Sequence, residues 1–540
     1  MKVYEAMARA LADLGATTLF GLMGDGNLYL VQSFVHDQDG AFVAAANEGG
    51  ATLMALGYAT VSGRPGLVSV THGPGLTNCV SALFEGVKGR IPLILLCADT
   101  AAEDRDYAQN IPQRETIVAT GAGFEQVRSP RTAVEDLLTA WRRAQAERRP
   151  IALNIPRDFQ WEEFDYQPVS FRRSDHRTVV PEGPDVDDGV GIIASARRPV
   201  ILAGRGAIGP DDRAAMLRLA DRIGAPVSTT LNARDLFKGE PHNLGIFGSL
   251  STAIAADCIL ESDTVIAFGA SLNRQTTSHG AFLRGKRVVQ VSLDPADIGR
   301  YVSPDVGIVG DMARTADLVV NWLDQAEIPS THFASSDLAR NLAAYDPLSE
   351  FDDVPHSGGV NMAQALIAID SAISAERVVV TDAGRYLFQP WKLIGVHHPR
   401  FFLNTLYSGS IGFGVSEAIG AGAAAPGLPV LAIVGDGGFM LGGLAEFNTA
   451  VRHGTDLIVV VCNDRAYGAE HIELRRRDMD PVLTTFDWPS FAEVGRSLGG
   501  DGITLASDAD VPAVVAAIRN RTRPLIVDIL LDPDAMPHFR

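Results

Sequence analysis

The residues best suited to chemistry form the run Gly435-Asp436-Gly437-Gly438, which follows the apolar stretch Val430–Val434. Glycines let backbone amides approach an anion closely, and a helix that begins at such a run adds its N-terminal amides, so the run is suited to binding phosphate. The carboxylate of Asp436 is a hard oxygen ligand of the kind that magnesium or calcium takes beside a diphosphate. The run therefore predicts a phosphate site that holds a divalent cation.

A second carboxylate follows the next apolar stretch, Leu457–Cys462, which ends in Asn463-Asp464. Asn463 comes 26 residues after Gly437, enough for a crossover helix and a return to a parallel strand. Adjacent parallel strands lie about 4.8 Å apart, and open α/β sheets bind ligands at the carboxyl ends of their strands. Either aspartate alone is typical of a turn, but the two at this spacing indicate one shared site.

The segment from Gly435 to Asp464 resembles the signature of the thiamine diphosphate-dependent enzymes, Gly-Asp-Gly followed about two dozen residues later by Asn-Asn or a close variant. The resemblance covers nearly the whole chain and is closest to the acetohydroxyacid (acetolactate) synthase group. It implies thiamine diphosphate and Mg²⁺ as cofactors, with magnesium bound by Asp436, Asp464 and the backbone carbonyl of Ala466. Asp464 stands where the family often has Asn, and the added negative charge makes a divalent cation more necessary.

The same resemblance implies the remaining cofactor contacts. Gly384, Arg385 and Tyr386, in the stretch DAGRYLF, resemble the loop that touches the diphosphate. Ile411 matches the residue that wedges the cofactor into a bent shape, and Gly409 matches the carbonyl that accepts from the aminopyrimidine amino group. Ile411 could also be an ordinary core residue, but its flanking glycines favour the cofactor contact. The implied cofactor-binding set is completed by Gly435, Asp436, Gly437, Gly438, Asp464, Tyr467 and Gly468.

Three residues of the N-terminal third are the candidates for catalysis. Glu48 follows a predicted strand and opens a helix, where an acid that satisfies the helix dipole is common, but the resemblance implies that it tautomerises the aminopyrimidine. His72 follows the predicted strand Leu67–Thr71, and two interpretations stand equal: a proton shuttle to the bound intermediate, or a turn histidine bonded to backbone. Gln113, in NIPQRET, matches a glutamine of acetohydroxyacid synthases.

The resemblance implies a lyase or transferase that cleaves or forms a C–C bond beside a carbonyl, by 2-oxoacid decarboxylation, carboligation or both. Its partner would be a small 2-oxoacid or acyloin, which the sequence does not identify. Gln113 has the unusual flanks Pro112 and Arg114, so a non-standard substrate side is expected. The tryptophan that these synthases carry after Tyr-Gly-Met is absent from the run Tyr467–His471, which argues against 2-oxobutyrate-preferring acetolactate chemistry.

Parallel sheets must position these residues. Apolar, β-branched runs alternate with Ala- and Leu-rich amphipathic segments, which is the pattern of βαβ units. Two polar stretches, Phe164–Asp188 and Pro329–Gly359, divide the chain into three blocks. We therefore predict three doubly wound α/β domains: a pyrimidine-binding domain over 1–165, a central Rossmann-like domain over 180–330 and a diphosphate-binding domain over 355–540.

The first and third blocks resemble each other. Pro65 and Pro426 are 361 residues apart, and Asp99 and Asp464 are 365 residues apart. A near-constant offset suggests a duplicated domain, although any two parallel α/β domains share part of this rhythm. In the family resembled, the glutamate domain of one subunit faces the diphosphate domain of another, so we expect a homodimer or homotetramer with shared sites.

Three other functions are alternatives. The run Gly204–Gly209 fits the dinucleotide pattern GxGxxG, as in a nicotinamide-dependent dehydrogenase, but no acidic residue ends the next strand, near Pro226–Thr230. A thiamine- and FAD-dependent oxidase is the second alternative, because the central domain of the family sometimes holds FAD; FAD is possible here but is not predicted. A non-catalytic family member is the third, and Glu48, Asp436 and Asp464 together argue against it.

Composition argues against several partners. The chain has 540 residues and a net charge of −19, which disfavours nucleic-acid binding because phosphate contacts need clustered Lys and Arg. No apolar run reaches membrane-spanning length, so no membrane partner is expected. The first 20 residues indicate an amphipathic helix rather than a signal peptide. The four scattered cysteines form no zinc or disulfide pattern, so a cytoplasmic location is expected.

Overall fold

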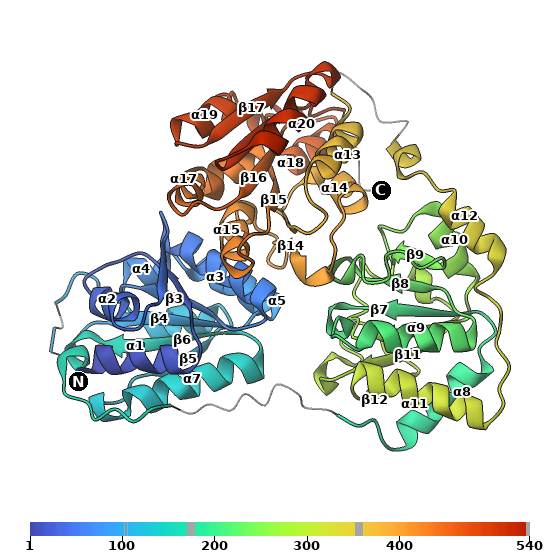
Figure 1. The fold of residues 1–540 in the computed structure, drawn as a ribbon, viewed down its shortest axis with the longest axis horizontal. Helices are drawn as coiled ribbons and strands as arrows, with labels where there is room; N and C mark the ends of the chain where they lie inside the picture. The colour runs from blue at the N-terminus through green and yellow to red at the C-terminus, as the bar shows by residue number, and fades with distance from the viewer. Residues whose placement is uncertain (102, 105, 170–178, 352–359, 536–540) are drawn as a thin grey trace. The chain divides into compact units, whose positions relative to one another are not determined.

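In a computed structural model the chain folds around three parallel sheets of six strands each (Figure 1). The structure describes residues 1–101, 103–104, 106–169, 179–351 and 360–535. The parts of the two expected linkers numbered 170–178 and 352–359 lie outside the described residues. Each expected block contributes one sheet, so the α/β class with three parallel sheets is confirmed.

The N-terminal sheet has the strand order β2-β1-β3-β4-β6-β5, with every pair parallel. Helices α1 (Val3–Asp13), α2 (Leu28–His36) and α7 (Ala133–Glu147) share a buried apolar cluster with these strands. Other helices of this block are α3 (Glu48–Ser62), α4 (Pro74–Thr77), α5 (Val80–Gly89) and α6 (Gln113–Ala119). The strands are β1 (Thr18–Gly21), β2 (Ala41–Ala44), β3 (Gly66–Val70), β4 (Leu93–Asp99), β5 (Gly123–Gln126) and β6 (Pro150–Pro156).

The expected helix over residues 1–20 is wrong in its last third. Helix α1 ends at Asp13, and Thr18–Gly21 forms strand β1. Gly15 lies between them with a φ of 81°, a left-handed conformation that stops a helix and that glycine adopts without strain. The following threonines and Phe20 suit a buried strand, which pairs with both β2 and β3.

The C-terminal sheet has the order β14-β13-β15-β16-β18-β17. Counted from the first strand of each block, both sheets follow the order 2-1-3-4-6-5, which supports the predicted duplication. The strands are β13 (Val378–Thr381), β14 (Phe402–Asn404), β15 (Val430–Gly435), β16 (Leu457–Asn463), β17 (Asp501–Leu505) and β18 (Leu525–Leu530). Helices of this block include α13 (Met362–Ala372), α15 (Gly414–Ala424), α17 (Leu444–Arg452), α18 (Gly468–Arg475) and α20 (Val511–Asn520).

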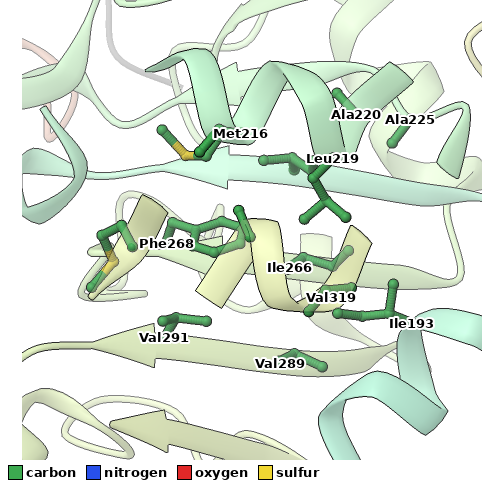
Figure 2. Packing of buried hydrophobic residues seen from close by; sticks show 14 of the residues in the cluster. Ile193, Met216, Leu219, Ala220, Ala225, Ile266, Phe268, Val289, Val291 and Val319 are labelled. Carbon is green, nitrogen blue, oxygen red and sulfur yellow. The ribbon is translucent and has the colours of Figure 1, made fainter. Parts of the chain in front are cut away.

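The central sheet has the order β12-β11-β10-β7-β8-β9, which is the 3-2-1-4-5-6 order of the Rossmann fold read from one edge. Figure 2 shows Met216 and Leu219 of α9 (Asp212–Ile223) packed near Ile266 and Phe268 of β10. Helices α8 (Pro184–Ser195) and α11 (Met312–Gln325) belong to the same cluster. The strands are β7 (Pro199–Ala203), β8 (Val227–Thr229), β9 (Asn243–Ile246), β10 (Thr264–Phe268), β11 (Arg287–Ser292) and β12 (Val306–Val309).

The glycines of Gly204–Gly209 have a packing role. A Cβ on Gly204 would lie 2.4 Å from the Cα of Ala270, and one on Gly206 would lie 2.9 Å from the Cα of Gly269. Close approach to the backbone after β10 therefore explains both glycines. Because β8 is followed by Thr230 rather than an acidic residue, the turn lacks the ribose-binding group of a dinucleotide site.

The chain divides into two compact units, one containing the first and third sheets and one containing the central sheet. Within the first unit, α3 packs against α15 so closely that a Cβ on Gly57 would lie 2.1 Å from the carbonyl oxygen of Glu417. A Cβ on Gly420 would likewise lie 1.8 Å from the carbonyl oxygen of Met54. The two helices therefore run antiparallel. In the part of the chain that the structure describes, no helix combines the length and apolar character needed to cross a membrane.

Candidate active site

The two carboxylates expected to share a cation lie at the ends of neighbouring strands. Strand β15 pairs in parallel with β16, with Gly435 opposite Cys462. Asp436 and Asp464 therefore follow adjacent strands at the carboxyl edge of the C-terminal sheet. The neighbouring strands on which the sequence argument depended are confirmed, and this edge is where such sheets bind ligands.

Asp436 is buried, with 2% of its surface exposed, and it begins the short helix α16 (Asp436–Gly438). The indole Nε1 of Trp488 donates a hydrogen bond of 3.0 Å to its Oδ2. Burial raises the pKa of Asp436 to about 6, although hydrogen bonds from the Gly437 amide and from Trp488 oppose the shift. A bound cation would replace the solvation that burial removes from this carboxylate.

Asp464 is also buried, and its Oδ1 accepts a hydrogen bond of 3.1 Å from the amide of Ala466. Burial and the neighbouring Asp436 raise the pKa of Asp464 to about 7, and Arg385 opposes the shift. Two buried carboxylates that disfavour each other's charged form suit a divalent cation. In the described ranges no three His, Cys, Asp or Glu side chains gather as a metal cluster, so any metal here would rely on two carboxylates and a backbone oxygen.

Glycines beside these carboxylates allow close packing that a larger residue would prevent. A Cβ on Gly437 would lie 2.5 Å from the ring of Tyr467. A Cβ on Gly468 would lie 2.6 Å from Oδ2 of Asp464. The ring of Tyr467 and the carboxylate of Asp464 therefore lie against these two glycines, which are small enough for this packing. Glycine amides at a helix start are the kind of group that holds a diphosphate beside a cation.

Side chains of the stretch after β13 contact the backbone around the expected diphosphate site. The guanidinium of Arg385 donates to the carbonyls of Gly468, at 3.1 Å, and Pro533, at 2.6 Å. The hydroxyl of Tyr386 donates at 2.8 Å to the carbonyl of Asp382, and its ring covers the glycine that precedes Arg385. Because the Tyr386 hydroxyl is occupied by backbone, the expected contact of this stretch with diphosphate would come from its backbone or from Arg385.

The expected cofactor loop is held by Asp382, a residue that the sequence argument missed. Its Oδ2 accepts from the amide of Gly412 at 2.8 Å, and its Oδ1 accepts from the amide of Phe413 at 3.2 Å. Burial raises the pKa of Asp382 to about 6 against these hydrogen bonds. Ile411 is half-buried, and Gly409 has a φ of 79° with open space where a Cβ would stand. The loop therefore leaves both residues accessible to a ligand.

Glu48 is the first residue of α3 and follows β2 at the carboxyl edge of the N-terminal sheet. Its Oε2 accepts a hydrogen bond of 2.9 Å from Nδ2 of Asn78. Asn47 caps the helix by accepting from the amides of Gly49 and Gly50. The expected strand–Glu–helix context is confirmed, while the catalytic role of Glu48 stays a prediction.

A single chain does not bring Glu48 to the cofactor loop. Because α3 and α15 run antiparallel, Glu48 lies at one end of the helix pair and the loop of Gly409 and Ile411 at the other. Glu48 lies nine residues before Gly57 in α3, and the start of α15 lies three residues before Glu417. Glu48 and the start of α15 are therefore separated by roughly 18 Å along the helix axes, at 1.5 Å per residue. The described chain thus presents two separate half-sites.

His72 is fully buried after β3 and belongs to a cluster that the sequence argument missed. Its ring lies 5.2 Å from that of Tyr107, whose hydroxyl donates at 2.6 Å to Asp25. Arg157 lies 3.3 Å from Asp25 and over the Tyr107 ring. Among the described residues Nε2 of His72 has no hydrogen-bond partner. Burial lowers the pKa of His72, which favours a neutral imidazole that can accept a proton.

Gln113 is buried and its amide is used by the protein. Its Oε1 accepts from the amide of Gly73 at 2.9 Å, and its Nε2 donates to the carbonyl of Ala98 at 2.9 Å and to Asn154 at 3.2 Å. These contacts favour a role in positioning the turn after His72, and its catalytic role stays a prediction. A cavity of about 440 Å³ opens beside it, lined mainly by polar side chains that include Asp99, Thr100, Asp104, Asn110, Arg114 and Glu115.

Three sequence models of known domains match the chain. Residues 1–120 match the thiamine pyrophosphate enzyme N-terminal TPP-binding domain. Residues 186–319 match the central domain of the same enzymes, and residues 382–529 match their C-terminal TPP-binding domain. The two TPP-binding matches cover the two half-sites described above.

Curated relatives align over almost the full chain. A probable acetolactate synthase large subunit from Methanococcus aeolicus is 26% identical over 98% of this chain and 92% of its own length. A sulfoacetaldehyde acetyltransferase from Alcaligenes xylosoxydans xylosoxydans is 27% identical over 95% of this chain and 90% of its own length. An acetolactate synthase from Mycobacterium leprae is 26% identical over 98% and 87%. The similarity thus extends to relatives with different named reactions.

Proposed function

We propose a reaction for this chain on the premise that it belongs to the thiamine pyrophosphate-dependent enzymes of the acetolactate synthase-like family. Members of this family carry out C–C chemistry of the carboligase and decarboxylase type, and this chain does the same. The finer proposal is decarboxylation of a small 2-oxoacid, carboligation of the resulting acyl unit, or both. The observation that carries it is the pair of buried carboxylates, Asp436 and Asp464, at adjacent strand ends.

The C-terminal half-site would hold the cofactor through its diphosphate. We propose that Asp436, Asp464 and the carbonyl of Ala466 bind Mg²⁺, because the two carboxylates are buried and disfavour each other's charge. Glycine backbone at the start of α16 and α18 would hold the phosphates. Bound thiamine diphosphate supplies an electron sink for the bond beside the substrate carbonyl.

The N-terminal half-site would move protons. Glu48 is half-buried and accessible at the carboxyl edge of the sheet, where its carboxyl could protonate the aminopyrimidine ring. We propose His72 as the group that accepts or donates a proton at the substrate side, because its imidazole is buried and of lowered pKa. Asp25 and Tyr107 would fix the orientation of this ring.

A complete site would need two chains. Glu48 and the loop of Gly409 lie at opposite ends of the α3–α15 pair, so we propose that Glu48 of one subunit meets the diphosphate domain of its partner in a homodimer or homotetramer. Apolar side chains around the diphosphate domain, Leu441, Val482 and Leu483, are exposed in the chain alone. A second copy of the chain would cover them.

The four cysteines are unpaired and buried, which supports the cytoplasm as the location.

The experiment that tests this proposal is a carbonyl panel with magnesium and thiamine diphosphate. We expect consumption of at least one 2-oxoacid or acyloin that depends on both additions. Sulfoacetaldehyde belongs in the panel, because one relative is named a sulfoacetaldehyde acetyltransferase. Substrate consumption that does not depend on added magnesium and thiamine diphosphate would contradict the proposal. A yellow protein whose flavin is reduced by substrate would favour an oxidase, since neither decarboxylation nor carboligation removes electrons from the substrate.

A further inference from the structure

Two buried glutamates outside the half-sites form matching contacts across the first and third blocks of the chain. Glu85 lies on α5 and is 0% exposed, and Glu446 lies on α17 and is 2% exposed. Burial raises the pKa of both carboxyls, and hydrogen bonds from backbone amides oppose the shift. A buried carboxyl needs such donors, so the identity of the donors shows what each glutamate holds.

Each glutamate accepts hydrogen bonds from two successive backbone amides of the other block. Glu446 accepts from the amides of Ala46 and Asn47, both at 3.1 Å. Glu85 accepts from the amide of Tyr407 at 3.0 Å and from that of Ser408 at 2.7 Å. In each case the two carboxylate oxygens take one amide each, a bidentate arrangement that fixes the direction of the bound backbone.

The two contacts are copies of one another. Glu85 and Glu446 are 361 residues apart, the same separation as Pro65 and Pro426. The amides held by Glu446, at positions 46 and 47, are also 361 residues before those held by Glu85, at positions 407 and 408. Duplication of the domain with an equal strand order accounts for this correspondence. We call each glutamate with its two bound amides a clamp. Glu85 of the first block holds the third block, and Glu446 of the third block holds the first.

The residue after each clamped pair is a proposed cofactor contact. Glu48 follows Asn47, and Gly409 follows Ser408, again 361 residues apart. We propose that Glu446 and Glu85 are positioning residues, which hold Glu48 and the Gly409 carbonyl where they would reach the ring nitrogen and the amino group at the edge of the aminopyrimidine. This inference rests on the proposed function for the roles of Glu48 and Gly409. The clamp contacts themselves are independent of it.

Small residues beside both clamps make room for these contacts. A Cβ on Gly50 would lie 2.1 Å from Oε1 of Glu446, so only glycine lets the carboxylate reach the start of α3. A Cβ on Gly89 would lie 2.8 Å from the ring of Tyr407, so glycine also makes room on the other side. Thr449 donates at 2.8 Å to Oε2 of Glu446 and fixes that carboxylate further.

Glutamine is the informative replacement because it keeps the shape. Its side chain has one acceptor oxygen and one NH₂ donor, so Glu446→Gln or Glu85→Gln would place a donor against one of the two clamped amides. One of the two hydrogen bonds to the backbone amides is lost in each variant, and the backbone segment that it held moves. Glu135→Gln is the control, because Glu135 is an exposed glutamate on α7. Glu417 is unsuitable, because its charge interacts with those of Glu85 and Asp382.

Hydrogen–deuterium exchange on the cofactor-free protein tests the clamps directly. Glu446→Gln should speed exchange in the peptide that contains Ala46–Glu48, and Glu85→Gln in the peptide that contains Tyr407–Gly409. Each change thus acts on the other block, and Glu135→Gln should affect neither peptide. Unchanged exchange in both clamp variants, while they fold as the wild type does, would overturn the inference whatever the enzyme's activity.

The functional consequence differs between the two variants. Glu446→Gln should lower turnover by about 10²-fold, the scale of a misplaced catalytic group, with little change in affinity for thiamine diphosphate. Glu85→Gln should weaken that affinity by about 10-fold, the scale of one hydrogen bond, and lower turnover as well. The near-ultraviolet circular dichroism of the bound aminopyrimidine should change in both and not in Glu135→Gln. Equal kinetics and spectra in all three variants would refute positioning.

If the sites are shared, Glu446 and Glu85 of one chain act on different sites of the dimer. Glu446 positions the Glu48 that its chain gives to one site, and Glu85 positions the Gly409 that the same chain gives to the other. A mixed dimer of Glu446→Gln and Glu85→Gln chains therefore keeps one intact site and should regain activity. If Glu48→Gln chains are rescued by Asp436→Ala chains and this pair is not rescued, the clamp assignment fails. If neither pair is rescued, the shared site of the proposed function fails instead. The hydrogen–deuterium exchange result alone then decides whether Glu446 and Glu85 hold the two backbone segments.

Discussion

The indole N–H of Trp488 donates a 3.0 Å hydrogen bond to Oδ2 of Asp436, the carboxylate that begins helix α16. The bond occupies one oxygen of a buried carboxylate and fixes its plane. Outer contacts of this kind hold a metal ligand in place and tune its affinity. Trp488 lies 52 residues beyond Asp436 in the chain, so no local motif indicates it.

We expect Trp488→Phe to weaken magnesium-dependent binding of thiamine diphosphate by about 10-fold, the lower end of the range for losing such an outer contact. Phenylalanine keeps a ring for the stacking of Trp488 on Phe486 and removes only the donor. Isothermal titration with magnesium and cofactor measures the change. Trp322→Phe, at an exposed position of α11, is the matched control and should bind as the wild type does. Equal affinities in both variants would show that the bond to Asp436 is not used.

Asp436→Ala should abolish binding of magnesium and thiamine diphosphate. Without this ligand the cation is poorly held, and the diphosphate then faces the carboxylate of Asp464 directly. Removing a buried carboxylate whose pKa is raised to about 6 should not unfold the chain, and circular dichroism checks this. Calorimetry that finds undiminished magnesium-dependent binding in the folded variant would refute the metal site.

The sequence predicts the C-terminal half-site well because its parts are local. Asp436 and Asp464 follow two consecutive strands of one block, and the spacing alone predicts that they are neighbours. Asp382 had a weaker signal of the same kind, a carboxylate directly after the strand β13 (Val378–Thr381), but no spacing rule connects it to the loop of Gly412. Its role emerges only from the contacts with the loop amides.

The cluster around His72 shows what sequence cannot supply. Asp25 follows β1, Tyr107 follows β4, and Arg157 follows β6, and the strand order of the sheet brings these strand ends together. Aspartate in a Gly-Asp-Gly turn is typical of the turn itself, so Asp25 carried no separate signal. The same holds for the contacts of Gln113, whose partners lie up to 41 residues away.

His72 should make folding stability depend on pH. Burial lowers its pKa, with Arg157 in the same direction and Asp25 and Asp99 opposed. As pH falls below about 6.5, the ordinary histidine value, the unfolded chain gains a proton at this position that the folded chain does not, so stability falls until the lowered folded pKa is reached. His72→Gln should therefore lose less thermal stability than the wild type between pH 7.5 and pH 5.5, values chosen to bracket about 6.5.

Thermal unfolding at the two pH values measures this effect. His36→Gln, at an exposed position at the end of α2, is the control and should show the wild-type dependence on pH. If His72→Gln and the wild type lose equal stability on acidification, the imidazole is not held neutral by the fold. The proposed proton acceptor at the substrate side would then lose its electrostatic support.

Glu48→Gln should leave binding of thiamine diphosphate nearly intact, because the metal and diphosphate contacts lie in the C-terminal half-site. Its turnover should fall by roughly 10²–10⁴-fold, the usual scale for losing one acid–base group. Glutamine can still accept a hydrogen bond from Asn78, which in the wild type donates to Oε2 of Glu48 at 2.9 Å, so the change removes the proton rather than the fold. Calorimetry and steady-state kinetics on the same preparation separate the two effects.

Mixing the variants tests whether the half-sites belong to different chains. A dimer of one Glu48→Gln chain and one Asp436→Ala chain has one site with both defects and one site with none, so the mixture should recover up to about half of the wild-type activity per mixed dimer, since two-fold symmetry gives two sites. Subunit exchange is followed with differently tagged chains, and each variant alone is the control. The antiparallel α3–α15 pair separates Glu48 from the cofactor loop within one chain, which is the reason to expect rescue. An active monomer, or exchanged dimers that stay inactive while both parents remain folded, would contradict the shared site.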